Sequence, residues 1–127
     1  VVEDNDVNMM ICVALLEQRG AHVVQAADGR LALQAVREQA EQGRAIDLVL
    51  MDLQMPVMGG LEATRLLRAE YNRFELPIIG LSAVAFASER ADALAAGMND
   101  FVVKPIEPRK LERAIIRAAA ERMEVLR

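Results

Sequence analysis

The chain has 127 residues, of which 54% are hydrophobic, so it can bury one core but is too short for two. Its formal net charge is −4 and its basic residues are scattered, which argues against direct nucleic-acid binding by this segment. One cysteine permits no internal disulfide and favours a reducing, cytoplasmic setting, and no apolar stretch approaches the ~20 residues that span a bilayer. We therefore expect a soluble segment without membrane contact, whose parent could still be membrane-anchored.

Two helical patterns occupy the first third of the chain, each preceded by a short apolar segment. We interpret Val1 and Val2 as the end of a strand cut at its start, in one domain over residues 1–127 that was excised from a longer protein. A strand over residues 22–26 and a helix over residues 30–42 follow. A helix over residues 6–19 lies between Val2 and this strand. It is predicted from an apolar stripe with helical spacing: Val7, Met10, Ile11, Ala14 and Leu15.

The rest of the chain alternates strands and helices. The apolar run of Ile46 and residues 48–51 is typical of a strand buried on both faces, and it ends at Asp52. Pro56 and Gly59-Gly60 then break the strand. The remaining predicted elements are a helix over 61–71, a strand over 77–81, a helix over 88–96, a strand over 100–103, and a helix over 107–123 with the stripe Leu111, Ala114, Ile115, Ala118 and Ala119.

This alternation predicts an α/β fold, a doubly wound, five-stranded parallel sheet with helices on both faces. Because the crossovers are right-handed, the carboxyl ends of all strands lie along one edge, where such sheets bind ligands. Polar residues follow four of the strands, and we expect them to meet at that edge: Glu3 and Asp4, Asp52, Ser82, and Lys104.

Carboxylates that converge repel one another unless a cation lies between them. The candidate ligands are oxygens, because His22 begins an early strand and Cys12 lies on a helix, so we favour Mg²⁺, with Mn²⁺ as a substitute. A carboxylate bound to the metal and facing Lys104 and Ser82 is suited to attack phosphorus and form an acyl phosphate.

Each residue also has an ordinary structural interpretation when it is taken alone. Asp52 could end a strand in a turn, Ser82 could be a loop hydroxyl, and Lys104 could be a surface charge. Their joint order at four strand ends favours the functional interpretation. For His22 and Cys12 the structural interpretation holds, since neither has a partner that would make a site.

Over essentially its whole length, the sequence resembles the receiver domain of two-component response regulators. The sequence around residues 5–8 and 97–101 is most similar to receivers attached to hybrid sensor histidine kinases. The segments that carry the resemblance are VVEDN (1–5), DLVLMDLQMP (47–56), LSA (81–83), AGMNDF (96–101) and KP (104–105).

The resemblance implies a flavodoxin-like sheet with strand order 2-1-3-4-5. It also implies that Asp52 is the phosphoacceptor, that Asp4, Asp52 and the Gln54 backbone carbonyl bind Mg²⁺, and that Glu3 helps mainly through water. Lys104 would pair with the phosphoryl group and Ser82 would donate a hydrogen bond to it. Phe101 matches the aromatic switch position, whose ring rotates as Ser82 moves, and the Lys104-Pro105 bond would be cis.

Two residues depart from the usual receiver pattern. Glu3 stands where many receivers have an aspartate, which could shift the metal slightly. Gly59 stands where an aspartate is common, so the loop after Asp52 is expected to be more mobile. Neither departure removes a reacting group.

For such a domain the phosphoryl donor would be a phosphohistidine on a histidine kinase or a histidine phosphotransfer domain. Val7, Met9 and Met10 are the candidate docking residues; of these, we expect Met10 to pack in the core and Met9 to face the partner. The fourth helix, fifth strand and fifth helix would change on phosphorylation and could form a homodimer. Gln54 and Val84 flank the approach of water without offering a general base, so we expect slow autodephosphorylation.

Two alternatives belong to other classes. A pseudo-receiver would keep the fold as a protein-interaction module without accepting phosphate. A phosphatase of the aspartyl-phosphate type would need an acid two residues after the nucleophile, where this chain has Gln54.

Overall fold

A computed structural model describes residues 1–83 and 86–126. In this part of the chain, three strands form one parallel sheet in the order β1 (Val49–Asp52), β2 (Ile78–Ser82) and β3 (Asp100–Val103). Asp52 lies opposite Leu81 and Ser82 lies opposite Val103 in the sheet register. The two polar residues therefore end neighbouring strands at the same edge, as the sequence predicted.

The two amino-terminal strands of the prediction are reduced to single residue pairs. Val2 bridges Ala26 on one side and Met51 on the other, both in parallel orientation. The spatial order is thus the Ala26 segment, Val2, β1, β2 and β3, which agrees with the predicted order 2-1-3-4-5. The expected strand over residues 22–26 is wrong in extent, because of these residues only Ala26 forms a bridge, to Val2.

Five helices surround the sheet within the described residues. Asn5 caps the first by accepting a hydrogen bond from the Asn8 amide at 3.0 Å, and Asp28 caps the second from the Leu31 amide at 2.9 Å. Gly97, at a φ of 110°, ends the fourth in the left-handed conformation. Their bounds are α1 (Asp6–Gln18), α2 (Gly29–Glu41), α3 (Gly60–Arg68), α4 (Ala87–Ala96) and α5 (Pro108–Leu126).

Two helix boundaries differ from the predicted ones by more than two residues. The third helix ends at Arg68 instead of residue 71, and just beyond it the Asn72 side chain accepts hydrogen bonds from the amides of Phe74 and Glu75, which holds a turn. The last helix continues to Leu126. None of the helices described is both long and apolar enough to cross a membrane.

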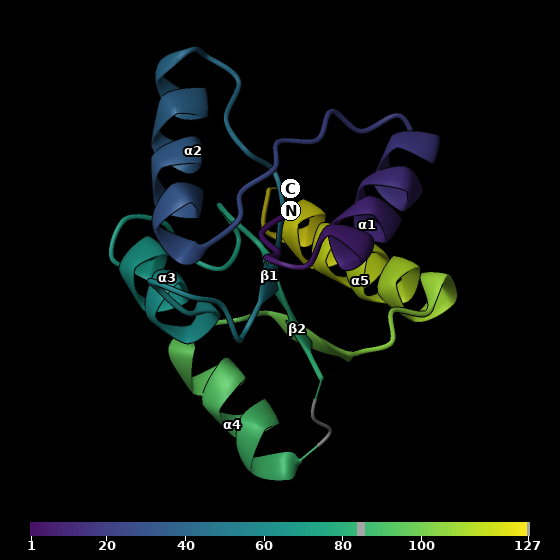
Figure 1. The fold of residues 1–127 in the computed structure, drawn as a ribbon. Coiled ribbons are helices and arrows are strands. Elements are labelled where there is room, and N and C mark those ends of the chain that lie inside the picture. Colours follow the sequence, from purple (N-terminus) through teal and green to yellow (C-terminus); the bar gives the residue numbers. More distant parts are fainter. Residues whose placement is uncertain (84–85, 127) are drawn as a thin grey trace.

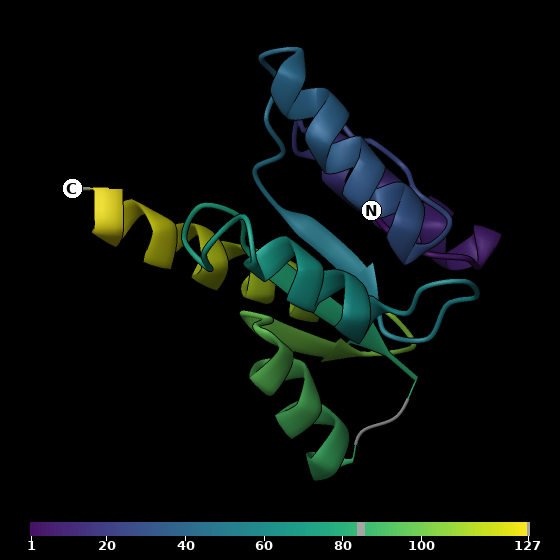
Figure 2. The same cartoon turned by 90° about the vertical axis from the view of Figure 1, so that its left-hand side faces the viewer.

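The core is split by the sheet into two apolar clusters. One joins α2, α3 and α4 to Val49, Met51 and Ile78; the other joins α1 and α5 to Leu50 and Ile79. Successive strand residues therefore point to opposite faces, as a doubly wound sheet requires. Figures 1 and 2 show α1 and α5 together on one side of the sheet and α2 and α3 on the other.

The apolar stripe predicted for α1 is turned the wrong way. Val7 and Met10 are 62% and 66% exposed, and of the five stripe residues only Leu15 is buried, together with Cys12. The expectation that Met10 packs in the core was therefore wrong, while Met9 is half-buried. Residues 9–16 are apolar without interruption, so periodicity could not decide which face of this helix is buried.

Candidate functional site: an acidic cluster at the sheet edge

Asp52 is the last residue of β1 and is only 3% exposed. Its amide donates to the Val2 carbonyl at 2.9 Å, and its side-chain Oδ1 accepts from the Gln54 amide at 3.2 Å. Gly60, at the start of α3, packs on the same backbone, since a Cβ there would collide with the Asp52 carbonyl oxygen. The carboxylate is thus held by its own strand, the neighbouring Val2 segment and the close approach of α3.

Glu3 and Asp4 reach the same place because Val2 lies beside β1. Carboxylate oxygens of Glu3, Asp4 and Asp52 all lie within 4.8 Å of one another. Glu3 is 2% exposed, and its Oε1 accepts from the Asn5 amide at 3.1 Å, whereas Asp4 is open to solvent. The predicted convergence of three acids from two separate segments is what the structure has.

Lys104 joins the cluster from the end of β3. Its Nζ lies 2.9 Å from Glu3 Oε2 and 3.3 Å from Asp52 Oδ2. Burial lowers the pKa of Lys104, but the hydrogen bond to Glu3 and the charge of Asp52 outweigh burial and leave the pKa above its usual value. Lys104 is therefore a fixed positive charge facing the carboxylates, and its bond to Pro105 is cis, as expected.

One ammonium does not neutralise the cluster. Burial, the largest cause, raises the pKa of Asp52 to about 6, and the neighbouring Glu3 carboxylate acts in the same direction. The Gln54 amide and the charge of Lys104 lower the pKa of Asp52 but do not offset these effects. The cluster consequently carries more negative charge than its protein partners balance.

The residues at this edge fit a hard divalent cation. Glu3 Oε2 is buried and lies at ion-pair distance from Lys104, yet it accepts no hydrogen bond of acceptable geometry from the described residues. This oxygen lacks a hydrogen-bond donor and lies beside two other carboxylates. Carboxylate oxygens are the ligands that Mg²⁺ prefers. Glu3, Asp4 and Asp52 are the residues that would hold the ion.

Ser82 is buried at the end of β2, and its hydroxyl donates to Glu89 Oε1 at 2.9 Å. The sequence singled out Ser82 but missed Glu89, which lies in the first turn of α4. Phe101, on β3, is half-buried and packs against the core cluster that contains Ala93 and Met98. The roles expected of Ser82 and Phe101 on phosphorylation stay predictions.

The other singled-out residues lie outside the cluster. Gln54 and His22 are exposed, Cys12 lies on the buried face of α1, and Val84 falls outside the described residues. Desolvation raises the pKa of the Cys12 thiol to about 11, which agrees with a structural role.

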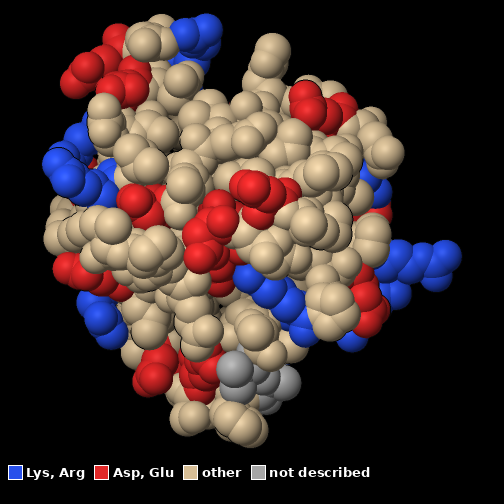
Figure 3. All heavy atoms as spheres, in the orientation of Figure 1, with Lys and Arg blue, Asp and Glu red and all other residues tan. Residues whose placement is uncertain are grey.

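The surface around the site has no massed basic patch on the face shown in Figure 3, where basic and acidic side chains are interspersed and acids gather near the centre. Beside the cluster, α1 presents an exposed apolar stripe made of Val7, Met10, Ile11 and Ala14.

A parallel α/β sheet with an acidic cluster and a lysine at its carboxyl edge is the arrangement that the resemblance to receiver domains implies, and comparison with known proteins agrees with the family. The response regulator receiver domain family matches residues 1–116. The chain belongs to this family.

Its relatives include bacterial sensor proteins. The chain is 42% identical over 119 residues to the sensor protein GacS of Pseudomonas syringae pv. syringae, covering 91% of this chain, and 45% identical over 108 residues to the CAI-1 autoinducer sensor kinase/phosphatase CqsS of Vibrio cholerae, covering 84%. It spans only 13% and 15% of these two relatives.

Solved structures give the same picture. The receiver domain of a sensor histidine kinase from Pseudomonas aeruginosa, with a magnesium ion coordinated in its active-site cleft, is 44% identical, with a TM-score of 0.74 and 91% of each chain covered. The chemotaxis protein CheY4 of Vibrio cholerae is 30% identical with a TM-score of 0.77, covering 92% of this chain and 93% of that one.

Proposed function

We propose that this receiver domain, one unit over residues 1–127, accepts a phosphoryl group on Asp52 from a phosphohistidine. An Asp52 carboxylate oxygen attacks phosphorus, the phosphorus–nitrogen bond of the donor breaks, and the imidazole leaves. The product is an acyl phosphate on Asp52. The observation that carries the proposal is the gathering of Glu3, Asp4, Asp52 and Lys104 at one edge. Carboxylate oxygens of the three acids lie within 4.8 Å of one another, and the ammonium lies 2.9 Å from Glu3 and 3.3 Å from Asp52.

Each residue of the cluster has a role in this transfer. Asp52 must be ionised to attack, and its raised pKa shows that the metal-free site disfavours that charge. Lys104 would pair with the transferring phosphoryl oxygens and Ser82 would donate to one of them. Bound Mg²⁺, or Mn²⁺ in its place, would neutralise the carboxylates and the phosphoryl charge, with Asp4, Asp52 and the Gln54 carbonyl as ligands and Glu3 acting through water.

The exposed stripe of α1 supports a docking site for the donor, a histidine kinase or histidine phosphotransfer domain. An apolar stripe lies on α1, which begins at Asp6 close to the cluster: Val7, Met10, Ile11 and Ala14. Apolar side chains left in water at this density are typical of an interaction surface. Met10 replaces Met9 as the principal docking residue, because Met9 is half-buried.

The surface that responds to phosphorylation would lie away from the α1 stripe. Phosphorylation would move Ser82 inward, Phe101 would fill the space behind it, and the surface of α4, β3 and α5 would change for a partner or a second copy. The parent would be a hybrid kinase, and the domain would act in the cytoplasm. Autodephosphorylation would be slow, because Gln54 offers no general base. The same residue argues against a phosphatase of the aspartyl-phosphate type, which would need an acid at this position.

The test is incubation with Mg²⁺ and acetyl phosphate followed by intact mass. The wild type should gain the mass of one phosphoryl group, and EDTA should prevent the gain. Asp52→Asn should gain none, whereas Asp47→Asn, which removes an exposed carboxylate outside the cluster, should behave like the wild type. A folded wild type that takes up no phosphoryl group would overturn the proposal in favour of a pseudo-receiver.

A further inference from the structure

The amino-terminal end of α4 is held by the same hydroxyl that the proposed chemistry needs. Ser82 Oγ donates to Glu89 Oε1 at 2.9 Å, and Glu89 lies in the first turn of α4. Ser82 is 1% exposed and Glu89 is half-buried, so water competes weakly for this bond. A hydrogen bond to a charged acceptor in such a place is stronger than one between neutral groups.

A serine hydroxyl has one hydrogen to donate. While that hydrogen points to Glu89, it cannot be donated to an oxygen of a phosphoryl group on Asp52. A phosphoryl dianion is the more highly charged acceptor and would also repel the Glu89 carboxylate. The two hydrogen bonds of Ser82 therefore exclude each other, and the phosphorylated state favours loss of the bond to Glu89.

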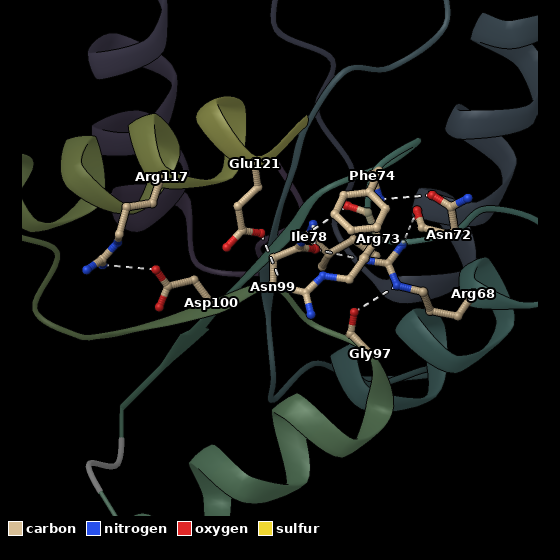
Figure 4. Close-up of polar contacts among 10 residues, drawn as sticks. All are labelled: Arg68, Asn72, Arg73, Phe74, Ile78, Gly97, Asn99, Asp100, Arg117 and Glu121. Atoms are coloured by element: carbon tan, nitrogen blue, oxygen red, sulfur yellow. Dashed lines mark hydrogen bonds and ion pairs between the residues drawn. The ribbon is translucent and has the colours of Figure 1, made fainter. Parts of the chain in front are cut away.

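The other end of α4 is fixed by different contacts (Figure 4). Arg68, at the end of α3, donates from Nε to the carbonyl of Gly97, which caps α4, at 2.7 Å, and from Nη2 to Asn99 Oδ1 at 2.9 Å. Its Nη1 also donates to the Leu76 carbonyl at 2.8 Å. Asn99 Oδ1 in turn accepts from the Ile78 amide at 2.9 Å, at the start of β2.

We infer that Glu89 is a positioning residue that sequesters the Ser82 hydroxyl in the unphosphorylated domain, and that phosphorylation releases the first turn of α4 while Arg68 holds its last turn. The inference rests on the proposed function for the phosphorylation step. The contact between Ser82 and Glu89 does not depend on the proposed function. The consequence is a helix that moves at one end, adjoining the proposed output surface.

The first experiment measures the rate of phosphorylation by acetyl phosphate with Mg²⁺. Glu89→Ala should react about three- to tenfold faster than the wild type, because the hydroxyl no longer has to leave a charged acceptor. Asp92→Ala, which removes an exposed acid from the same helix, should stay within about twofold of the wild type. In a Ser82→Ala background, Glu89→Ala should have no further effect. Equal acceleration by Asp92→Ala, or acceleration that persists without Ser82, would overturn the inference.

The second experiment needs no phosphorylation. Hydrogen exchange of the Arg90 and Ala91 amides in the unphosphorylated protein should be faster in Glu89→Ala and also faster in Ser82→Ala, because both variants lose the hydrogen bond between Ser82 and Glu89. Glu89→Gln, which keeps an acceptor oxygen, should lie nearer the wild type than Glu89→Ala does. Exchange at Met98, next to the Arg68 contact, should not change.

Two outcomes of the exchange experiment would contradict the inference. Normal exchange in Ser82→Ala would show that Glu89 acts on its helix alone, through the helix dipole. Equal exchange in Glu89→Gln and Glu89→Ala would show that charge, not the hydrogen bond, is what holds the turn. If the wild type takes up no phosphoryl group, the proposed function fails, and the exchange experiment still decides the Ser82–Glu89 contact.

Discussion

The acidic cluster predicts that Asp52 destabilises the fold when no metal is bound. Asp52→Asn removes the buried charge but keeps an oxygen that can accept from the Gln54 amide, and Lys104 keeps its contact with Glu3. In EDTA, the variant should therefore have a higher free energy of unfolding than the wild type. The gain should depend on pH, because the wild-type carboxyl group titrates.

The magnitude follows from the pKa of Asp52. Its value is about 6 in the folded protein, against 3.8 for an unperturbed aspartate. This difference of about two pH units between the folded and the unperturbed pKa of Asp52, at about 1.4 kcal/mol for each, lowers the free energy of unfolding by at most about 3 kcal/mol. Because the folded pKa is the raised one, the wild type binds a proton in the folded state that the unfolded state has lost. Wild-type stability relative to the variant therefore falls as the pH rises from about 4 to about 6, and levels off above that.

Urea unfolding of both proteins at several pH values, in EDTA, measures this difference. The advantage of Asp52→Asn should be small near pH 4 and grow to about 1–3 kcal/mol near neutral pH. Asp47→Asn controls for the loss of one exposed carboxylate. Saturating Mg²⁺ should stabilise the wild type by about 2.7 kcal/mol at a hundredfold excess over its dissociation constant, and the variant by less. A variant that is equally or less stable than the wild type in EDTA across this pH range would refute the electrostatic account of the cluster.

Three further predictions concern other parts of the molecule. Cys12, with its pKa raised to about 11, should resist a thiol reagent in the native protein near pH 8, where about one thiol in a thousand is ionised, and react on unfolding; rapid stoichiometric labelling of the native state would contradict its burial. Val57 has a φ of 66° and is 80% exposed, so Val57→Asn should raise the free energy of unfolding by about 1 kcal/mol, and a destabilised variant would argue against this backbone conformation. Met10→Asp should slow phosphotransfer from a phosphohistidine protein at least about tenfold, whereas Leu66→Asp on α3 should not. Phosphorylation by acetyl phosphate, which needs no docking, shows whether the variant is still folded. Equal phosphotransfer rates in the two variants would exclude the α1 stripe as the docking site.

The sequence predicted the sheet edge well because strand composition and chain order are local properties with a global consequence. Apolar runs that end at Asp52 and Ser82, together with right-handed crossovers, place polar residues along one edge whatever the details of packing. Glu3 and Lys104, a hundred residues apart, meet for this reason.

The features that the sequence did not predict depend on tertiary context. The uninterrupted apolar run in α1 carries no signal for its buried face, so Met10 was expected in the core although it is exposed. The contact between Ser82 and Glu89 joins the end of β2 to the first turn of α4, and no spacing rule anticipates it. Arg68 was not singled out in the sequence, and in the structure it donates to carbonyl oxygens of two other segments.

The most direct test of the account is to locate the phosphoryl group itself. Protein phosphorylated with Mg²⁺ and either donor can be reduced with borohydride, which converts an aspartyl phosphate to homoserine, and then digested and sequenced by mass spectrometry. The account predicts homoserine at position 52 and nowhere else, and no conversion in protein treated with EDTA. Conversion at Asp4 or another acid with Asp52 unmodified would contradict it.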